Sequence, residues 1–317
     1  MAQRVAVVTG GMGGLGEAIC MKLARMGIKV VVTYSPSNTK AEAWLKDMAA
    51  RDYHFSAYPV DVSDFDSCAA AVAKIQSEIG PVDILINNAG ITRDTTFKKM
   101  SKVDWTAVVS TNLDSVFNMC KPVVDGMVER GWGRVINVSS VNGQKGAFGQ
   151  TNYSAAKAGM HGFTKALALE VAKKGVTVNT ISPGYIGTKM VMAIPQEILD
   201  SKILPQIPVN RLGEPEEIAR AVVFHPDRRQ GGVNPLLASV LRRSRERRSA
   251  RTPRRRRSRC AAAGRTPLGW RSGRARRGSR CACRTAHRPR RRTAASPCAA
   301  RRRTPATGSS RSRRCTC

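Results

Sequence analysis

Charge divides the 317-residue chain into two unlike parts: residues 1–224 carry 24 Lys and Arg against 20 acids, whereas residues 225–317 carry 30 Arg, no Lys and 2 acids. The first part is long enough to bury a sizeable core, holds no apolar run of the roughly 18 residues that would cross a membrane, and has three cysteines too widely spaced for a disulfide framework or a metal site. With no signal peptide before the first apolar run, we expect a cytoplasmic protein that binds no metal.

Short β-branched runs alternate with longer amphipathic runs throughout residues 1–224. The predicted strands cover residues 4–10, 29–34, 54–62, 82–90, 133–140 and 176–184. The predicted helices cover 16–27, 39–51, 64–79, about 101–111, 112–130, 151–173, 196–203 and 214–224. This alternation predicts an α/β fold of the Rossmann type, a doubly wound parallel sheet covered on both faces. Ligands of such sheets bind beyond the carboxyl ends of the strands.

A glycine-rich loop, "TGGMGGLG" (Thr9–Gly16), joins the first predicted strand to the first helix. Glycines let the backbone turn tightly against a pyrophosphate, and the helix that follows presents free N–H groups to it. The loop therefore predicts dinucleotide binding. After the second strand comes "TYSPSNTK", which has no acid to bond a ribose 2′-hydroxyl and includes Lys40, so we expect NADP (NADPH) rather than NAD.

A second group of polar residues follows the fifth predicted strand, which ends at Ser139 and Ser140. Tyr153 and Lys157 come next, four residues apart, so they share one helix face at about 6 Å between Cβ atoms. A nearby ammonium favours the phenolate, so we expect Lys157 to lower the pKa of Tyr153. Such a phenol is a proton donor for a carbonyl oxygen, and a serine hydroxyl can hydrogen-bond the same oxygen.

The order of these motifs resembles the short-chain dehydrogenase/reductase family over about residues 3–224. The motifs that carry the resemblance are "TGGMGGLG", "DV" at 61–62, "NNAG" at 87–90, "STNLDSVFN", "NVSS", "YSAAK" and "ISPGYIGT". The resemblance implies a catalytic tetrad of Asn112, Ser140, Tyr153 and Lys157. It also implies cofactor contacts from Thr9, Gly10, Gly14, Leu15, Gly16, Lys40, Asp61, Val62, Asn88, Ala89, Gly90, Tyr153, Lys157, Pro183, Gly184 and Thr188.

Substrate choice in this family lies in the segments after the fifth and sixth strands. Here those segments look closely like acetoacetyl-CoA reductases of polyhydroxybutyrate synthesis and differ somewhat from the sister 3-oxoacyl-[acyl-carrier-protein] reductases. The resemblance implies reduction of a 3-ketone on an acyl thioester, with CoA favoured over acyl carrier protein. The expected substrate contacts are Ser140, Phe148, Gln150, Tyr153 and Tyr185. A lysine group at 98, 99 and 102 either meets CoA phosphates or a carrier protein, or faces water.

Residues 225–317 contain a single aromatic residue, Trp270, and too little apolar surface to repay the entropy of ordering, so we expect disorder. An arginine-rich arm of this kind could bind nucleic-acid phosphates. Its cysteines fit no standard zinc spacing. Arginine without lysine, with abundant Ala, Pro, Gly, Ser and Cys, is also typical of a GC-rich gene read out of frame.

We interpret the second part as the product of a frameshift, because the family pattern stops abruptly after Phe224. The chain then divides into a reductase domain, 1–224, and a basic tail, 225–317, whose contact with nucleic acid is incidental. The seventh strand usual in the family is lost. The homotetramer usual in the family is therefore in doubt, and we expect the chain as written to fold poorly or to be inactive.

Overall fold

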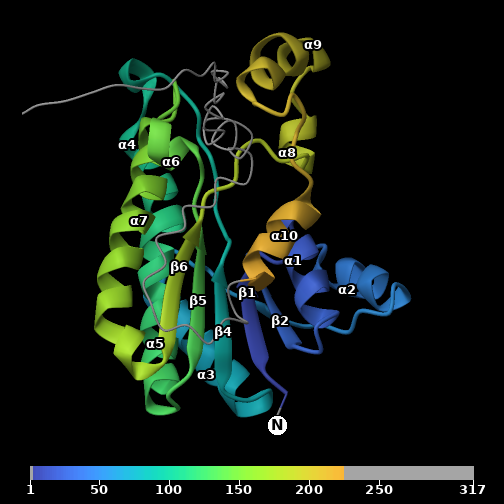
Figure 1. Cartoon of the computed structure of the whole chain (residues 1–317), viewed down its shortest axis with the longest axis vertical. Helices are drawn as coiled ribbons and strands as arrows, with labels where there is room; N and C mark the ends of the chain where they lie inside the picture. Colours follow the sequence, from blue (N-terminus) through green and yellow to red (C-terminus); the bar gives the residue numbers. More distant parts are fainter. Residues whose placement is uncertain (1–2, 225–317) are drawn as a thin grey trace, which may run out of the picture. The chain divides into compact units, whose positions relative to one another are not determined.

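Within residues 3–224, which the computed structural model describes, six parallel strands form one sheet in the order β3-β2-β1-β4-β5-β6 (Figure 1). The strands are β1 (Val5–Thr9), β2 (Lys29–Tyr34), β3 (Ser56–Pro59), β4 (Val82–Asn87), β5 (Gly133–Val138) and β6 (Val176–Ile181). Strand order reverses between β1 and β4, which is the doubly wound arrangement expected from the sequence. This reversal places a ligand site beyond the ends of β1 and β4.

Helices cover both faces of the sheet. Those of the described residues are α1 (Gly14–Ala24), α2 (Ala41–Ala50), α3 (Phe65–Glu78), α4 (Lys102–Val109), α5 (Ser115–Glu129), α6 (Asn142–Lys145), α7 (Thr151–Val171), α8 (Lys189–Met192), α9 (Gln196–Ile198) and α10 (Pro215–Phe224). Figure 1 shows α6 and the α8–α9 segment at the same end of the sheet, beyond the carboxyl ends of the strands. Side-chain caps help to set two of the helix starts: Asp64 accepts from Ser67 N ahead of α3, and Ser101 accepts from Asp104 N ahead of α4.

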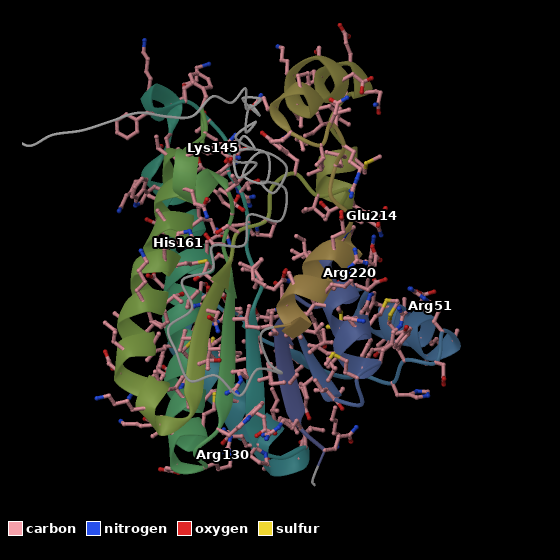
Figure 2. The ribbon with its side chains drawn as sticks, viewed as in Figure 1. Arg51, Arg130, Lys145, His161, Glu214 and Arg220 are labelled. Atoms are coloured by element: carbon pink, nitrogen blue, oxygen red, sulfur yellow. The ribbon has the colours of Figure 1, made fainter. Side chains whose placement is uncertain are left out.

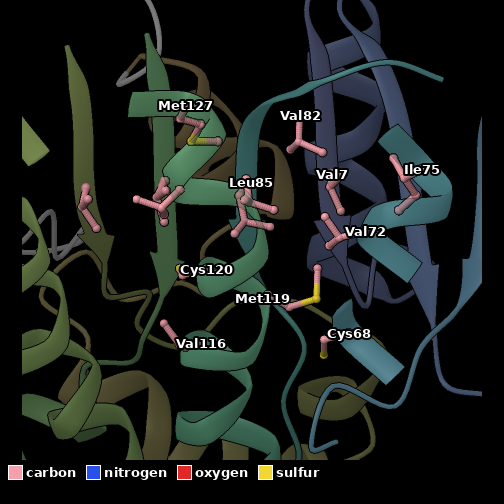
Figure 3. Close-up of a cluster of buried hydrophobic side chains, with 14 of the residues drawn as sticks. Val7, Cys68, Val72, Ile75, Val82, Leu85, Val116, Met119, Cys120 and Met127 are labelled. Atoms are coloured by element: carbon pink, nitrogen blue, oxygen red, sulfur yellow. The ribbon is translucent and has the colours of Figure 1, made fainter. Parts of the chain in front are cut away.

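Alternation along each strand divides the core into two clusters. Val7 and Leu85 point into the cluster formed with α3, α5 and α7, which Figure 3 shows in close-up. Their neighbours Val8 and Ile86 point to the opposite face, into the cluster formed with α1 and α10. Every residue of β1 and β5 is buried. The strands are apolar on both faces because both are covered, as expected for a parallel sheet.

The structure differs from the sequence prediction between α4 and α5. The sequence predicts two helices that meet at residues 111 and 112, whereas the backbone stays helical through a π-helical turn, Ser110–Asp114. The residues on either side, Val109 and Ser115, keep right-handed helical dihedrals. Asn112 lies inside this turn, and such turns occur often at functional sites because they re-aim a side chain. Predictions about residues 225–317 lie outside the described residues.

We predict that restoring the reading frame after Phe224 will stabilise the protein. Within residues 3–224, β6 pairs only with β5, so it forms one edge of the described sheet. A strand added beside β6 would bury large apolar side chains worth about 1.5–3 kcal/mol each, which is substantial against a total stability of about 5–15 kcal/mol.

The check is to resequence the gene and to compare urea unfolding of the chain as written with that of the frame-restored protein. We expect a higher midpoint and higher activity for the frame-restored protein. An unchanged sequence on resequencing, with equal stability of the two proteins, would contradict the frameshift interpretation.

Candidate active site

A cleft of about 680 Å³ opens where the strand order reverses. Its walls come from the carboxyl ends of the strands and the segments that follow them, from the π-helical turn and from α7. Most of the cofactor residues named from the sequence line it: Gly10, Gly14, Leu15, Gly16, Asp61, Val62, Asn88, Ala89, Gly90, Tyr153, Lys157, Pro183, Gly184 and Thr188. The catalytic residues Asn112 and Ser140 line it as well.

The glycine loop forms one wall of the cleft, and two of its glycines are required sterically. Gly10 has φ +61°, in the left-handed region that favours glycine. A Cβ on Gly16 would lie 2.8 Å from the Cα of Gly11 and 2.9 Å from Nδ2 of Asn88. The loop leads directly into α1, whose first N–H groups have no intrahelical partners. This wall therefore fits a pyrophosphate, as the sequence predicts.

Thr9 supports the cleft without lining it. Its hydroxyl accepts hydrogen bonds from the backbone N–H groups of Asn88 and Ala89 at 2.9 and 3.0 Å, and it lies 3.4 Å from Ile86 O. Asn88 in turn donates through Nδ2 to the carbonyl oxygens of Thr9 and Gly10. These bonds tie the loop after β4 to the glycine loop, so the two walls keep a fixed separation.

Asn112 is placed in the cleft by the π-helical turn. Its Nδ2 donates to Ile91 O at 2.9 Å and to Val108 O at 2.8 Å. Its Oδ1 is buried and has no hydrogen-bond partner among the described residues. Gly90 faces this oxygen, and any Cβ there would clash with it. An unsatisfied acceptor at a ligand cleft is a position for a bound water or a ligand hydroxyl.

Lys157 is buried, with 3% of its surface exposed. Its ammonium donates to Val138 O at 2.8 Å and lies 5.6 Å from the centre of the Tyr153 ring. Desolvation lowers the pKa of Lys157 to about 7. The side chain is therefore charged in only part of the molecules at neutral pH when the cleft is empty.

Tyr153 differs from the sequence expectation in its pKa. Burial raises the pKa of the phenol, a hydrogen bond with Ser140 lowers it, and the charge of Asp94 raises it further. The Lys157 nitrogen lies 5.6 Å from the centre of the Tyr153 ring and donates to Val138 O. The prediction that Lys157 lowers this pKa is wrong for the cofactor-free protein. The phenol keeps its proton at neutral pH.

The expected substrate contacts fall outside the cleft wall, apart from Ser140 and Tyr153. Phe148 is 93% exposed. Gln150 accepts from Asn142 Nδ2 at 2.9 Å and donates to Asp94 at 2.7 Å. Tyr185 packs against an apolar cluster that follows β6, built on Leu199, Ile203 and Ile207.

Sequence reasoning missed several residues that line the cleft. Thr33, Tyr34 and Ser35 do so at the end of β2, whereas Lys40, the residue named there, does not. Their position directly after a strand was the available signal. Asp94, whose charge acts on Tyr153, was also missed, since nothing in its neighbourhood of the sequence marks it as close to α7.

Comparison with known proteins agrees with this geometry. Residues 4–199 match the short chain dehydrogenase family, and the chain belongs to that family. Family membership implies a nicotinamide cofactor, and the glycine wall and the unsatisfied Asn112 oxygen fit such a group. Within the described residues, no set of His, Cys, Asp and Glu side chains is arranged to hold a metal ion, and no helix is long and apolar enough to span a membrane.

The chain is also similar to individual proteins over most of their length. An acetoacetyl-CoA reductase of Cupriavidus necator is 61% identical over 219 residues, which cover 69% of this chain and 89% of that protein. Nodulation protein G of Azospirillum brasilense is 58% identical over 224 residues, covering 71% and 91%. A 3-oxoacyl-[acyl-carrier-protein] reductase of Pseudomonas aeruginosa is 44% identical over 221 residues, covering 70% and 89%.

Proposed function

We propose that this protein is an NADPH-dependent reductase that converts acetoacetyl-CoA to (R)-3-hydroxybutyryl-CoA, a step of polyhydroxybutyrate synthesis. The observation that carries the proposal is the meeting of Ser140, Tyr153 and Lys157 in one cleft with the glycine loop. The 61% identity to an acetoacetyl-CoA reductase supports this substrate. Three buried free cysteines within residues 3–224 suit the reducing cytoplasm, where we place the enzyme.

The roles proposed for the chain's own residues are those that the family implies, and the positions of these residues in one cleft support them. NADPH supplies a hydride to the 3-carbonyl carbon when it is bound. The Tyr153 hydroxyl donates the proton to the carbonyl oxygen, and the Ser140 hydroxyl donates a hydrogen bond to the same oxygen as negative charge develops on it. Lys157, whose side chain lies in the cleft wall, would hold the ribose of the cofactor. Asn112 holds a water through its free Oδ1, and this water returns a proton toward Lys157.

The raised pKa of Tyr153 suits this direction of reaction. A phenol that stays protonated at neutral pH is ready to donate. In the opposite direction Tyr153 would have to act as a base, which needs the phenolate. The burial that raises this pKa therefore keeps Tyr153 in the form that reduction requires at neutral pH.

We predict a preference for NADPH over NADH. None of the side chains that line the cleft after β2, Thr33, Tyr34 and Ser35, is acidic. A 2′-phosphate meets no carboxylate there, whereas an NAD enzyme places one at this position. Replacing Ser35 with Asp should lower kcat/KM for NADPH by more than about tenfold, because two like charges would be brought together.

The Ser35→Asn variant is the neutral control and should change this value little. The preference is tested by measuring initial rates with NADPH and with NADH at matched concentrations. Equal or better activity of the wild type with NADH would contradict the NADP assignment.

The carrier of the acyl group is tested by comparing kcat/KM for acetoacetyl-CoA with that for acetoacetyl-[acyl-carrier-protein]. We expect the CoA ester to be the better substrate, in line with the higher identity to the CoA enzyme than to the carrier-protein enzyme. A higher value for the carrier-protein ester would make this protein a fatty-acid-synthesis reductase instead. Absence of turnover with both thioesters in the frame-restored protein would overturn the proposed function.

A further inference from the structure

Three consecutive residues at the end of β5 each hold a different group of α7. Val138 O accepts from the ammonium of Lys157 at 2.8 Å. Ser139 Oγ donates to the backbone carbonyl oxygen of Lys157 at 2.7 Å. Ser140 lies close enough to Tyr153 to lower the pKa of its phenol. Ser140 belongs to the proposed tetrad, but nothing in that tetrad accounts for Ser139, which is 4% exposed.

Ser139 is itself held on two sides. Its backbone N–H donates to Ile181 O, the last residue of β6, at 2.7 Å. Its hydroxyl lies 3.3 Å from Nε2 of His161, which projects from α7 one turn after Lys157 (Figure 2). Because the single hydroxyl hydrogen is given to Lys157 O, His161 must donate to Ser139. Burial lowers the pKa of His161, so its ring is neutral, and the bond to Ser139 requires the hydrogen of this ring to lie on Nε2.

A third contact closes the arrangement around Lys157. A Cβ on Gly143, in α6, would lie 2.7 Å from the carbonyl carbon of Lys157 and 2.9 Å from its Cβ. The backbone of α6 therefore packs directly on the backbone of α7 at this residue. Lys157 is held through its side chain by Val138, through its carbonyl by Ser139 and from the outside by Gly143.

We propose that Ser139 is a positioning residue for carbonyl reduction. Ser139 fixes the place of Lys157 in the cleft through its hydrogen bond to the backbone carbonyl of Lys157, and His161 is the donor that orients the serine. The inference rests on the proposed function in so far as Lys157 takes part in the reaction. Ser139 lies in the wall of the same cleft, but the hydrogen of its hydroxyl is given to Lys157 O, so this hydroxyl has no hydrogen left to donate to a ketone. Ser139 acts by keeping the Lys157 nitrogen at a fixed position relative to Tyr153. This position matters because displacements of about 1 Å in such a site lower the rate on the order of a hundredfold.

The test compares Ser139→Thr with Ser139→Val in the frame-restored protein, because threonine and valine have the same shape and differ by the hydroxyl. We expect Ser139→Val to lower kcat for acetoacetyl-CoA at least about tenfold with KM values changed less than about threefold, and Ser139→Thr to stay within about threefold of the wild type. Equal kcat values for the two variants would overturn the proposal.

A control separates positioning from stability. Thr180 on β6 also bonds to α7, through Thr164 at 2.7 Å, without touching Lys157. Thr180→Val should lower the melting temperature about as much as Ser139→Val and leave kcat unchanged. A comparable fall in kcat in Thr180→Val would show that any loosening of α7 suffices, which would overturn a specific role for Ser139.

Two further measurements keep the inference decidable. If Ser139→Val does not fold, His161→Leu takes its place, and His161→Gln serves as the control that keeps a hydrogen-bond donor. The value of kcat should fall in His161→Leu and not in His161→Gln. Equal kcat values for these two variants would contradict the proposal. If the wild type reduces no thioester, the proposed function fails. NMR titration of Lys157 still tests whether Ser139 positions this lysine. Its pKa should move at least about one unit toward the ordinary lysine value in Ser139→Val and not in Ser139→Thr; no movement in either would contradict the proposal.

Discussion

Replacing Lys157 with methionine is expected to lower kcat by about a hundredfold or more while making the cofactor-free protein more stable. Activity falls because methionine keeps the length of the side chain but offers no donor for the ribose and no partner for the proton relay. Stability rises because a buried ammonium is costly to desolvate, and methionine is not. A catalytic residue that destabilises the folded state is the signature of a site selected for chemistry.

The pH dependence of this stability effect has a definite sign. The pKa of Lys157 falls from 10.5 to about 7 on folding, so the folded protein loses the proton more readily than the unfolded chain. Between pH 7 and 10.5 the unfolded chain binds more protons, and stability rises with pH. Each unit of pKa shift corresponds to about 1.4 kcal/mol, so burying the charged lysine costs several kcal/mol. This cost is present in full below pH 7 and is absent above pH 10.5.

Urea unfolding of the wild type and of Lys157→Met, without cofactor, measures this difference. The variant should be the more stable protein at pH 6, and the two should converge as the pH rises toward 10.5. Equal stability at pH 6, or a less stable variant, would show that Lys157 is not buried as a charge. Retained activity of the variant would remove Lys157 from the reaction.

Local patterns were sufficient to predict much of the fold. β2 spans Lys29–Tyr34, the range predicted from its β-branched run, because a strand buried on both faces has an apolar pattern that does not depend on its neighbours. α6 was missed, since "NGQK" has no apolar spacing and its helical turn is fixed by packing of Gly143 on α7. The π-helical turn at Asn112 was missed for the same reason, as its side chain bonds reach Ile91 in another segment.

In the candidate site, too, residues placed by local spacing were predicted, and residues placed by contacts with distant segments were not. The glycine loop and Ser140 follow strands, and Tyr153 and Lys157 share a helix face, so their sequence spacing predicts their meeting. Asn112 was named from the family resemblance alone. The expected contacts Phe148, Gln150 and Tyr185 lie on connecting segments whose course depends on distant partners. Gln150 is held by Asp94, 56 residues away, and no local pattern encodes that pairing. The prediction for the pKa of Tyr153 was wrong because this pKa depends on burial, which sequence spacing does not measure.

Replacing Tyr153 with phenylalanine is expected to remove about two to four orders of magnitude from kcat. Phenylalanine fills the same volume, so α7 should keep its place against β5, and the loss should come from the missing proton alone. Binding of NADPH should stay within about threefold of the wild type, because the glycine loop and Lys157 remain. Ser140 would still hydrogen-bond the ketone oxygen, which accounts for a small residual rate.

The central claim is that the Tyr153 hydroxyl, held beside Lys157 in the nucleotide cleft, protonates the ketone of a 3-oxoacyl thioester. The most direct test is the rate of NADPH oxidation with acetoacetyl-CoA in the frame-restored protein, both as the wild type and as the Tyr153→Phe variant, with NADPH binding followed by fluorescence. The predicted result is rapid oxidation by the wild type, loss of turnover in the variant and intact NADPH binding in both. A Tyr153→Phe variant that turns over acetoacetyl-CoA at the wild-type rate would contradict the claim.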